Sequence, residues 1–243
     1  MKCPAKELDA SVVMPGDIIT EQVLDLIGKN ERVKLGPGLR QGNDSIVVCK
    51  SGILRHKQPS MFWIDSHQKR YVPIKGENVL GVIVGKIGDA YKVDIGSSDY
   101  VVLNNLFFEG ATKRNRPNLV NGDIVFGKLI SANKDMEPEL SCIDQSSGKA
   151  NGMGPVPSNG LLITVPLNLV RKILSPDCVL LPEMGKYFGF ETLIGMNGKI
   201  HLTSHSNKHI IAIMNMITTA EYMTNEQILE SLSSNTADNW QTA

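Results

Sequence analysis

The spacing of turn residues constrains the fold of this chain more than any other feature of its sequence. Over roughly its first two thirds, short β-branched runs alternate with Gly, Pro, Asn and Asp, which is the pattern of small sandwiches and barrels. A glycine followed by an acidic residue precedes an apolar run at Pro15–Asp17, Lys75–Glu77 and Asn121–Asp123. Each of these signals predicts a turn that leads into a strand, so we expect a mostly β chain up to residue 145.

Two boundaries divide the chain into three parts. The first lies near Tyr71–Pro73 and predicts an N-terminal β domain over residues 1–72. The segment 73–145 is rich in Val, Ile and Gly, and its strands and corner glycines predict a five-stranded OB-type barrel. The clearest strand candidates in that segment are Val79–Gly85, Ala90–Gly96, Asp123–Ile130 and Leu140–Asp144.

The period of the sequence changes after a low-complexity stretch, Gln145–Gly160, whose Gly, Ser, Asn and Pro content favours a loop. We expect an α+β module over residues 146–230, followed by a polar, frayed tail over 231–243. Its predicted elements are a short helix at Leu167–Leu174, strands at Phe190–Ile194 and Lys199–Leu202, and an apolar helix at Lys208–Met223. The expected fold class is therefore multi-domain and mostly β, with one α+β domain.

Charge and cysteine usage narrow the class of protein. The chain carries 25 Lys and Arg against 25 Asp and Glu, whereas a free-standing nucleic-acid binder usually has an excess of cations. This balance predicts a local basic patch inside a larger assembly. The four cysteines form no C-x-x-C pair and no histidine cluster accompanies them, so we expect reduced thiols in an intracellular protein, with no metal site and no cofactor. We also expect no signal peptide and no membrane segment.

The richest basic cluster is Lys113, Arg114 and Arg116, which falls between two strands of the expected barrel. OB-folds bind nucleic acid with one strand face and its flanking loops, and three cations there suit the backbone of a single strand. The alternative is a solvated charged loop, which the sequence leaves open.

A strand face that stacks bases is less well supported. Tyr91 is the main strand aromatic, and Lys86 and Lys92 lie close to it in sequence. All three are candidates for RNA contact, because single-strand binders combine aromatic rings with cations. Barrel packing and solubility explain the same residues, and this second reading is favoured.

Gly195, Met196, Asn197 and Gly198 match the G-x-x-G pattern of KH domains, whose loop clamps nucleic-acid backbone from between two helices. Here both flanking segments are strand-like. Asn-Gly between two strands is a strong hairpin signal, so we interpret this element as a tight turn with a structural role.

No catalytic constellation emerges from the sequence. The chain has no H-E-x-x-H, no G-x-S-x-G and no close pair of carboxylates on one element. His201, His205 and His209 are spaced by four residues, but His201 is predicted to lie on a strand. We therefore expect no catalytic residue and no enzymatic activity.

Several long strings resemble one family in order along nearly the whole chain. They lie at residues 36–40, 68–73, 111–117, 132–139, 151–154 and 195–200. On these strings the chain resembles the eukaryotic RNA exosome cap subunits with S1 and KH domains, the ribosomal RNA-processing protein forty or exosome component three family.

The resemblance implies an S1 barrel over 73–145 and a KH domain over 146–230. It implies a non-catalytic subunit of the RNA exosome, in the nucleus, nucleolus and cytoplasm, that acts in rRNA processing and RNA decay. Its expected partners are RNase PH-like ring subunits, the other cap subunits and single-stranded RNA, which the cap guides into the ring for 3′ to 5′ degradation. A purely structural brace of the ring without RNA contact is the alternative.

The resemblance also carries residue roles. It places Lys113, Arg114 and Arg116 on a cationic S1 loop facing the RNA path, and it makes Gly195–Gly198 a structural signature of the KH domain. One position departs from the family, because His201 stands where a tryptophan is common. Different packing is therefore expected around this residue.

Overall fold

The computed structural model describes residues 11–25, 32–57, 60–68, 70–112, 114–133 and 135–238. The chain divides into two compact units, Met1–His67 and Gln68–Ala243. This division falls slightly before the boundary that we predicted after residue 72. The Lys113 prediction lies outside the described residues.

The first unit is a small β domain with one short helix. Its elements are β1 (Val12–Val13), α1 (Thr20–Asp25), β2 (Lys34–Leu35), β3 (Leu39–Gln41), β4 (Ile46–Val48), β5 (Gly52–Lys57) and β6 (Met61–Asp65). The strand order β1-β5-β6-β2 forms one sheet, and β3 pairs with β4. Burial alternates along β6, so Phe62 and Ile64 enter the core with Leu54. Gly52 is required where the start of β5 lies against the end of β6, because a Cβ there would lie 2.3 Å from the Asp65 carbonyl oxygen.

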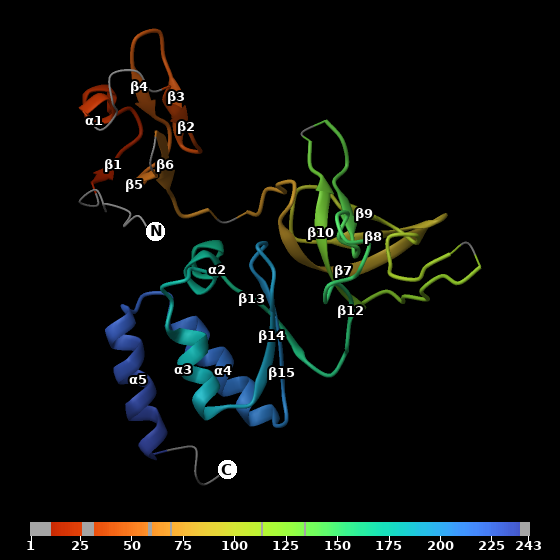
Figure 1. Ribbon diagram of the computed structural model, residues 1–243. Helices are drawn as coiled ribbons and strands as arrows, with labels where there is room; N and C mark the ends of the chain where they lie inside the picture. The colour runs from red at the N-terminus through yellow and green to blue at the C-terminus, as the bar shows by residue number, and fades with distance from the viewer. Residues whose placement is uncertain are drawn as a thin grey trace. The chain divides into compact units, whose positions relative to one another are not determined.

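The second unit begins with a closed barrel. Its strands are β7 (Asn78–Ile87), β8 (Ala90–Asp94), β9 (Val101–Asn104), β10 (Ile124–Ser131), β11 (Glu139–Ser141) and β12 (Gly154–Val156). The order β11-β9-β8-β7-β10 closes through an additional β10–β11 pairing, which confirms the expected five-stranded barrel (Figure 1). β12 adds to β10 outside the ring, so the barrel sheet continues past the predicted boundary at residue 145.

The three glycine–acid signals all lie in turns with a positive φ at the glycine: +100° at Gly16, +91° at Gly76 and +98° at Gly122. Two of them lead directly into β7 and β10. The first leads only to an isolated bridge at Ile18, after which α1 begins at Thr20. The signal therefore predicts the turn correctly in each case, and the strand in two of three.

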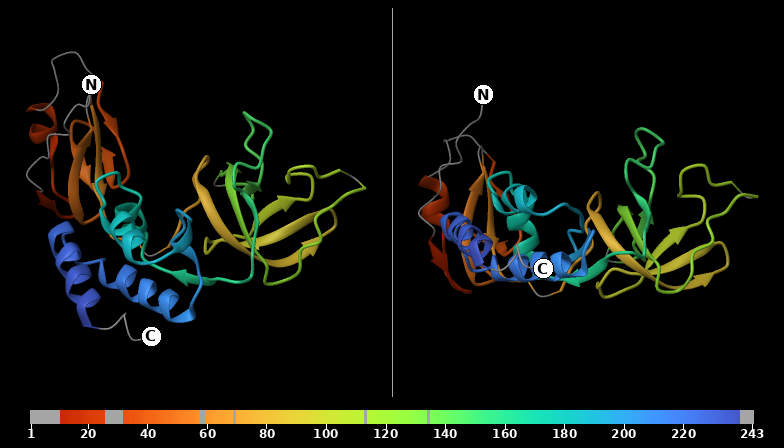
Figure 2. Two further views of the ribbon diagram at one scale, coloured as in Figure 1. Left: turned by 60° about the horizontal axis from the view of Figure 1, so that its bottom comes forward. Right: turned by 90° about the horizontal axis from the view of Figure 1, so that it is seen from below.

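The C-terminal part is an α+β domain. Its elements are β13 (Leu161–Thr164), α2 (Leu167–Ile173), α3 (Leu180–Tyr187), β14 (Phe190–Ile194), β15 (Lys199–Ser204), α4 (Asn207–Thr219) and α5 (Asn225–Asp238). The sheet order is β13-β15-β14, all antiparallel, and the helices gather on one side of it (Figures 1 and 2). β14 matches its predicted range, and α2, β15 and α4 match theirs to within a few residues.

The expected polar tail from residue 231 is wrong at its beginning. α5 continues to Asp238, and Ile228 and Leu232 are buried in the cluster that contains Leu180 of α3. The low overall hydrophobicity of this helix hid the two apolar positions, four residues apart, that hold it against the domain. Among the described helices none is long and apolar enough to cross a membrane.

Candidate nucleic-acid interface

The outer face of β8 and β9 carries a cation and an exposed aromatic ring. Burial alternates along β8, so Tyr91 and Val93 face the core whereas Lys92 faces outward. Tyr100, just before β9, is 49% exposed, and Lys92 Nζ lies 5.8 Å from the centroid of its ring. The second and third strands of an OB barrel form its nucleic-acid face. Lys92 and Tyr100 are therefore placed to offer a phosphate-binding charge beside a stacking surface.

The expectation that Tyr91 offers a stacking face is wrong. Its side chain is 1% exposed, so no base can reach the ring. The hydroxyl donates to the Pro117 carbonyl oxygen at 2.7 Å and accepts from the Leu119 amide at 3.3 Å. Lys86 is exposed, with its Nζ 5.5 Å from the centroid of the Tyr91 ring. Tyr91 thus packs the barrel and binds the chain that follows the basic cluster, as the alternative interpretation held.

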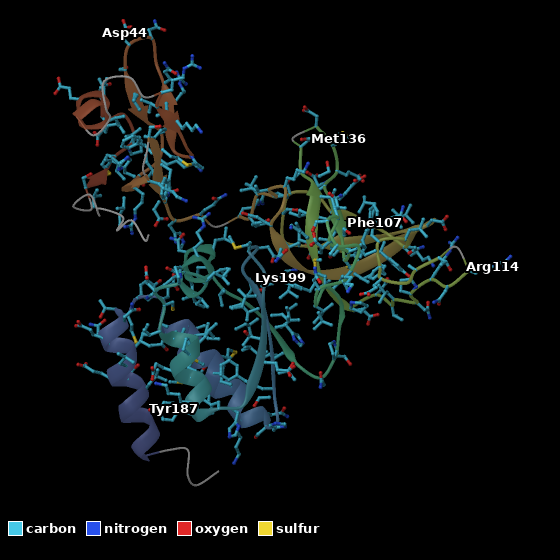
Figure 3. The ribbon with its side chains drawn as sticks, viewed as in Figure 1. Asp44, Phe107, Arg114, Met136, Tyr187 and Lys199 are labelled. Atoms are coloured by element: carbon cyan, nitrogen blue, oxygen red, sulfur yellow. The ribbon has the colours of Figure 1, made fainter. Side chains whose placement is uncertain are left out.

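The two described cations of the basic cluster have different surroundings. Arg114 is exposed and points away from the barrel (Figure 3). Arg116 makes an ion pair with Asp89 on the turn between β7 and β8. The structure therefore gathers Lys86, Tyr91 and Arg116 at one end of the barrel and places Lys92 on the strand face with Tyr100.

Sequence reasoning missed Tyr100 and Asp89. β9 was the one barrel strand without a predicted range, and assigning Val101–Asn104 from its β-branched start would have placed Tyr100 at a strand entrance. Asp89 follows Gly88 between two predicted strands, which marks a hairpin turn. Its pairing with Arg116 joins residues 27 positions apart, and no local sequence signal contains that contact.

The Gly195–Gly198 element is a hairpin turn between β14 and β15, as predicted, with Gly198 at φ +82°. The Asn197 side chain is buried, and both its amide oxygen and its amide nitrogen form hydrogen bonds to the barrel backbone. Its Oδ1 accepts from the Leu80 amide at 3.2 Å, and its Nδ2 donates to the carbonyl oxygens of Leu80 at 2.7 Å and Ile95 at 2.8 Å. A Cβ on Gly195 would lie 2.7 Å from the Leu80 nitrogen. The turn therefore fastens the α+β domain to the barrel.

A second polar contact lies next to this turn. Lys199 Nζ donates to the Asp94 carbonyl oxygen at 3.0 Å and lies 3.8 Å from its carboxylate. Burial lowers the pKa of Lys199, and the nearby Asp94 carboxylate opposes that shift. The net lowering shows that desolvation of the ammonium outweighs the attraction of its partner.

The connection between the first two helices of the α+β domain carries no phosphate clamp. In KH domains a G-x-x-G loop grips the nucleic-acid backbone at this place, whereas here Leu174–Val179 contains no glycine. The side chain of Asn225, at the start of α5, donates to the Asp177 carbonyl oxygen at 3.1 Å. The loop is therefore tied to α5 and lacks the residues that would let phosphates approach its backbone.

His201 occupies the centre of the three-stranded sheet. It lies on β15 between Leu162 of β13 and Leu193 of β14, and its side chain is 3% exposed. Its Nε2 is buried without a hydrogen-bond partner. Burial lowers the pKa of His201, and a hydrogen bond with the Pro157 backbone opposes this shift. The imidazole is thus a neutral core residue, at the position where a tryptophan was expected from the family.

Within the described ranges, no three His, Cys, Asp or Glu side chains come together in a way that could hold a metal ion. His205 and His209 are not grouped with His201 on one element, because His201 lies on β15 and His209 on α4.

Family models cover most of the chain. The S1 domain of exosome complex component RRP40 matches residues 71–154, the N-terminal region of mammalian RRP40 matches residues 11–67, and a KH domain matches residues 160–208. These matches agree with the barrel, the N-terminal β domain and the α+β domain described above. The fold therefore defines a multi-domain protein with an S1 barrel and a KH domain.

Relatives that match most of the chain support the same assignment. Exosome complex component RRP40 of Mus musculus is 49% identical over 201 residues, covering 81% of this chain and 73% of that protein. The Drosophila melanogaster protein of that name is 41% identical over 212 residues, covering 87% and 90%. A crystal structure described as a candidate exosome complex RNA-binding protein shares the fold, with a TM-score of 0.55 at 22% identity over 70% of this chain and 98% of that one. The chain belongs to the RRP40 family of exosome complex components.

Proposed function

We propose that this chain is a non-catalytic, RNA-contacting cap subunit of the RNA exosome, and that its S1 barrel guides single-stranded RNA toward the ring for 3′ to 5′ degradation. The observation that carries the proposal is the pairing of half-buried Lys92 with exposed Tyr100 on the β8–β9 face, because OB barrels bind single strands there. Arg114, exposed in the adjoining basic cluster, adds a cation that a phosphate can reach.

Two further observations support a subunit over an autonomous binder. The chain has no net charge, whereas phosphate neutralisation supplies most of the affinity of free nucleic-acid binders. The KH domain lacks the glycine loop that would clamp a backbone, and its signature turn is buried against the barrel. RNA contact is thereby assigned to the S1 barrel, and the other domains are assigned to assembly with ring and cap subunits. The proposed locations are the nucleus, nucleolus and cytoplasm, where such complexes process rRNA and degrade RNA.

The first experiment tests membership of the assembly. A tagged chain is purified from its native cells, and the co-purifying proteins are identified and counted. Recovery in equal amounts with RNase PH-like ring subunits and the other cap subunits supports the proposal. A chain that purifies alone contradicts it, and a divalent-metal-dependent RNA degradation assay on the pure protein then tests the enzymatic alternative.

The second experiment separates RNA contact from a purely structural brace. Lys113, Arg114 and Arg116 are replaced together by alanine, and binding of a fluorescent single-stranded RNA to the assembled complex is measured over a series of salt concentrations. We expect weaker binding and a shallower dependence on salt, because each lost phosphate contact lowers the slope by about 0.7. A matched control replaces Lys50, Lys149 and Lys208, which are exposed elsewhere. If the wild type, the triple-alanine variant and the control bind RNA with equal affinity and equal salt dependence, the structural brace is the remaining interpretation.

A further inference from the structure

The turn between β7 and β8 holds an acidic side chain against the basic cluster. Gly88 and Asp89 form this two-residue turn, and Gly88 has a φ of +56°, which fits a hairpin turn with glycine in its first central position. The Asp89 carboxylate accepts a hydrogen bond from Arg116 Nη1 and forms an ion pair with it. The pair joins the hairpin tip to residues 114–119, which we call the basic loop.

A second contact holds the basic loop two residues further along the hairpin. Tyr91, at the start of β8, is buried, so its hydroxyl is a fixed point of the barrel. It donates to the Pro117 carbonyl oxygen and accepts from the Leu119 amide. The two groups that it binds belong to Pro117 and Leu119, one and three residues after Arg116. The hairpin therefore holds the second half of the basic loop by an ion pair and by two hydrogen bonds to one hydroxyl.

Electrostatics then distinguish the two arginines. A phosphate that approached Arg116 would also approach the Asp89 carboxylate, whose side chain is 73% exposed. The carboxylate cancels much of the attraction that the guanidinium offers, because the two opposite charges lie within contact of each other. In the described part of the chain no carboxylate pairs with Arg114, which extends from the first half of the loop (Figure 3).

We propose that Asp89 and Arg116 form a clasp that positions the basic loop, and that Arg114 makes the phosphate contact while Arg116 makes none. Arg116 and Asp89 are thus positioning residues. This inference rests on the RNA contact proposed above, and it assigns different roles to the residues of that same site.

The two variants of the Asp89–Arg116 pair keep the net charge unchanged, so that net charge cannot explain their outcome, whereas R114Q removes one positive charge. The double variant D89N/R116Q removes the clasp, and the exchanged variant D89R/R116D rebuilds it with reversed polarity. R114Q removes the side chain that is proposed to bind phosphate. Binding of a fluorescent oligouridylate to the assembled complex is measured across salt concentrations. We expect R114Q to lower the salt slope by about 0.7. D89N/R116Q should weaken binding by up to about fivefold with the slope unchanged, as fits the loss of an exposed ion pair, and D89R/R116D should restore the wild-type affinity.

Two results would overturn the clasp. If Arg116 binds phosphate, D89N/R116Q lowers the slope as R114Q does, and the exchanged variant stays weak because its cation has moved to the hairpin. If the pair does nothing, D89N/R116Q binds like the wild type.

A measurement without RNA distinguishes failure of the proposed function from failure of the clasp. Amide hydrogen exchange at Leu119, whose N–H donates to Tyr91 Oη, is followed in the same proteins without RNA. The clasp predicts faster exchange in D89N/R116Q, by up to about fivefold, and wild-type exchange in D89R/R116D. A wild-type complex that binds no RNA refutes the proposed function and the assignment of Arg114. Unchanged exchange in D89N/R116Q refutes the clasp whatever the RNA result.

Discussion

Replacement of Asn197 by alanine removes the polar group that joins the KH domain to the S1 barrel. The side chain is 6% exposed, and its amide makes three hydrogen bonds to the backbone of Leu80 and Ile95. Met196 strengthens the same junction, since its amide donates to the Asn78 carbonyl oxygen at 2.9 Å. Alanine keeps that backbone bond and the turn, so the substitution tests the side chain alone.

The expected cost follows from these three bonds. A typical intramolecular hydrogen bond contributes about 1 kcal/mol to stability, so their loss costs about 3 kcal/mol. The groups left behind on Leu80 and Ile95 are buried, and any that water cannot reach adds a penalty of about 1–3 kcal/mol. Taking 3 kcal/mol as the lower figure, Tm of the unit Gln68–Ala243 should fall by about 6–12 °C.

Thermal unfolding of wild type and N197A measures this fall, and amide exchange at Leu80 localises it, because the Leu80 N–H donates to the replaced oxygen. N118A is the matched control, since Asn118 is an exposed asparagine of the same unit, and it should change Tm by less than about 2 °C. An N197A protein with the Tm of the control and unchanged exchange at Leu80 would refute the reasoning.

Three further predictions concern His201, Gly160 and Tyr100. Burial lowers the pKa of His201 below its ordinary value of 6.5, so the contribution of the neutral imidazole to stability is complete above about pH 6.5 and is lost as pH falls through the lowered pKa. Between pH 8 and pH 5 the Tm of H201L should therefore fall less than the Tm of the wild type. Equal falls in the two proteins would contradict this prediction. A Cβ at residue 160 would lie 2.4 Å from the His201 imidazole and 2.6 Å from the Leu202 carbonyl oxygen, so G160A should cost about 1–3 kcal/mol in urea unfolding, with only partial rescue by H201A; a neutral G160A would show that the strand shifts freely. Y100A should weaken single-stranded RNA binding to the complex by about 1 kcal/mol or more through lost stacking, whereas Y222A, which alters an exposed tyrosine of the KH domain, should not; equal affinities would remove Tyr100 from the interface.

The sequence predicted the architecture well where local chemistry determines it. Turns at Gly16, Gly76 and Gly122 need a positive φ that glycine adopts without strain, and all three turns lie where the sequence predicted them. β14 and β15 follow from an Asn-Gly signal between two apolar runs. The elements that were missed, among them α1, α3, α5, β9, β12 and β13, are held by tertiary contacts that no short window contains. α5 is the clearest case, because two buried residues, Ile228 and Leu232, attach an otherwise polar helix.

The candidate site was harder to predict, because its members are defined by burial and pairing. Tyr91 and Tyr100 are both tyrosines beside a lysine in the barrel sequence, yet one ring is in the core and the other is half exposed. Strand alternation decides between them. It could be applied to Tyr91 on the predicted strand Ala90–Gly96, whereas for Tyr100 it needed the range of β9, which was not predicted. Arg114 and Arg116 are two residues apart and chemically identical, and only the fold brings Asp89 to one of them.

The joint between the S1 barrel and the KH domain explains why the hairpin turn Gly195–Gly198, which lies away from the clamp position between α2 and α3, needs its small residues. The two hydrophobic clusters are separate, and Met196 is among the few side chains that pack against both. Apolar burial is non-directional, so a narrow apolar contact alone would leave the angle between the domains poorly specified. Hydrogen bonds to Asn197 are directional, and the missing Cβ of Gly195 lets the turn approach the Leu80 nitrogen. The small residues of this hairpin turn let its backbone approach the barrel, and the contact sets the direction in which the β8–β9 face and the basic loop are presented relative to the KH domain.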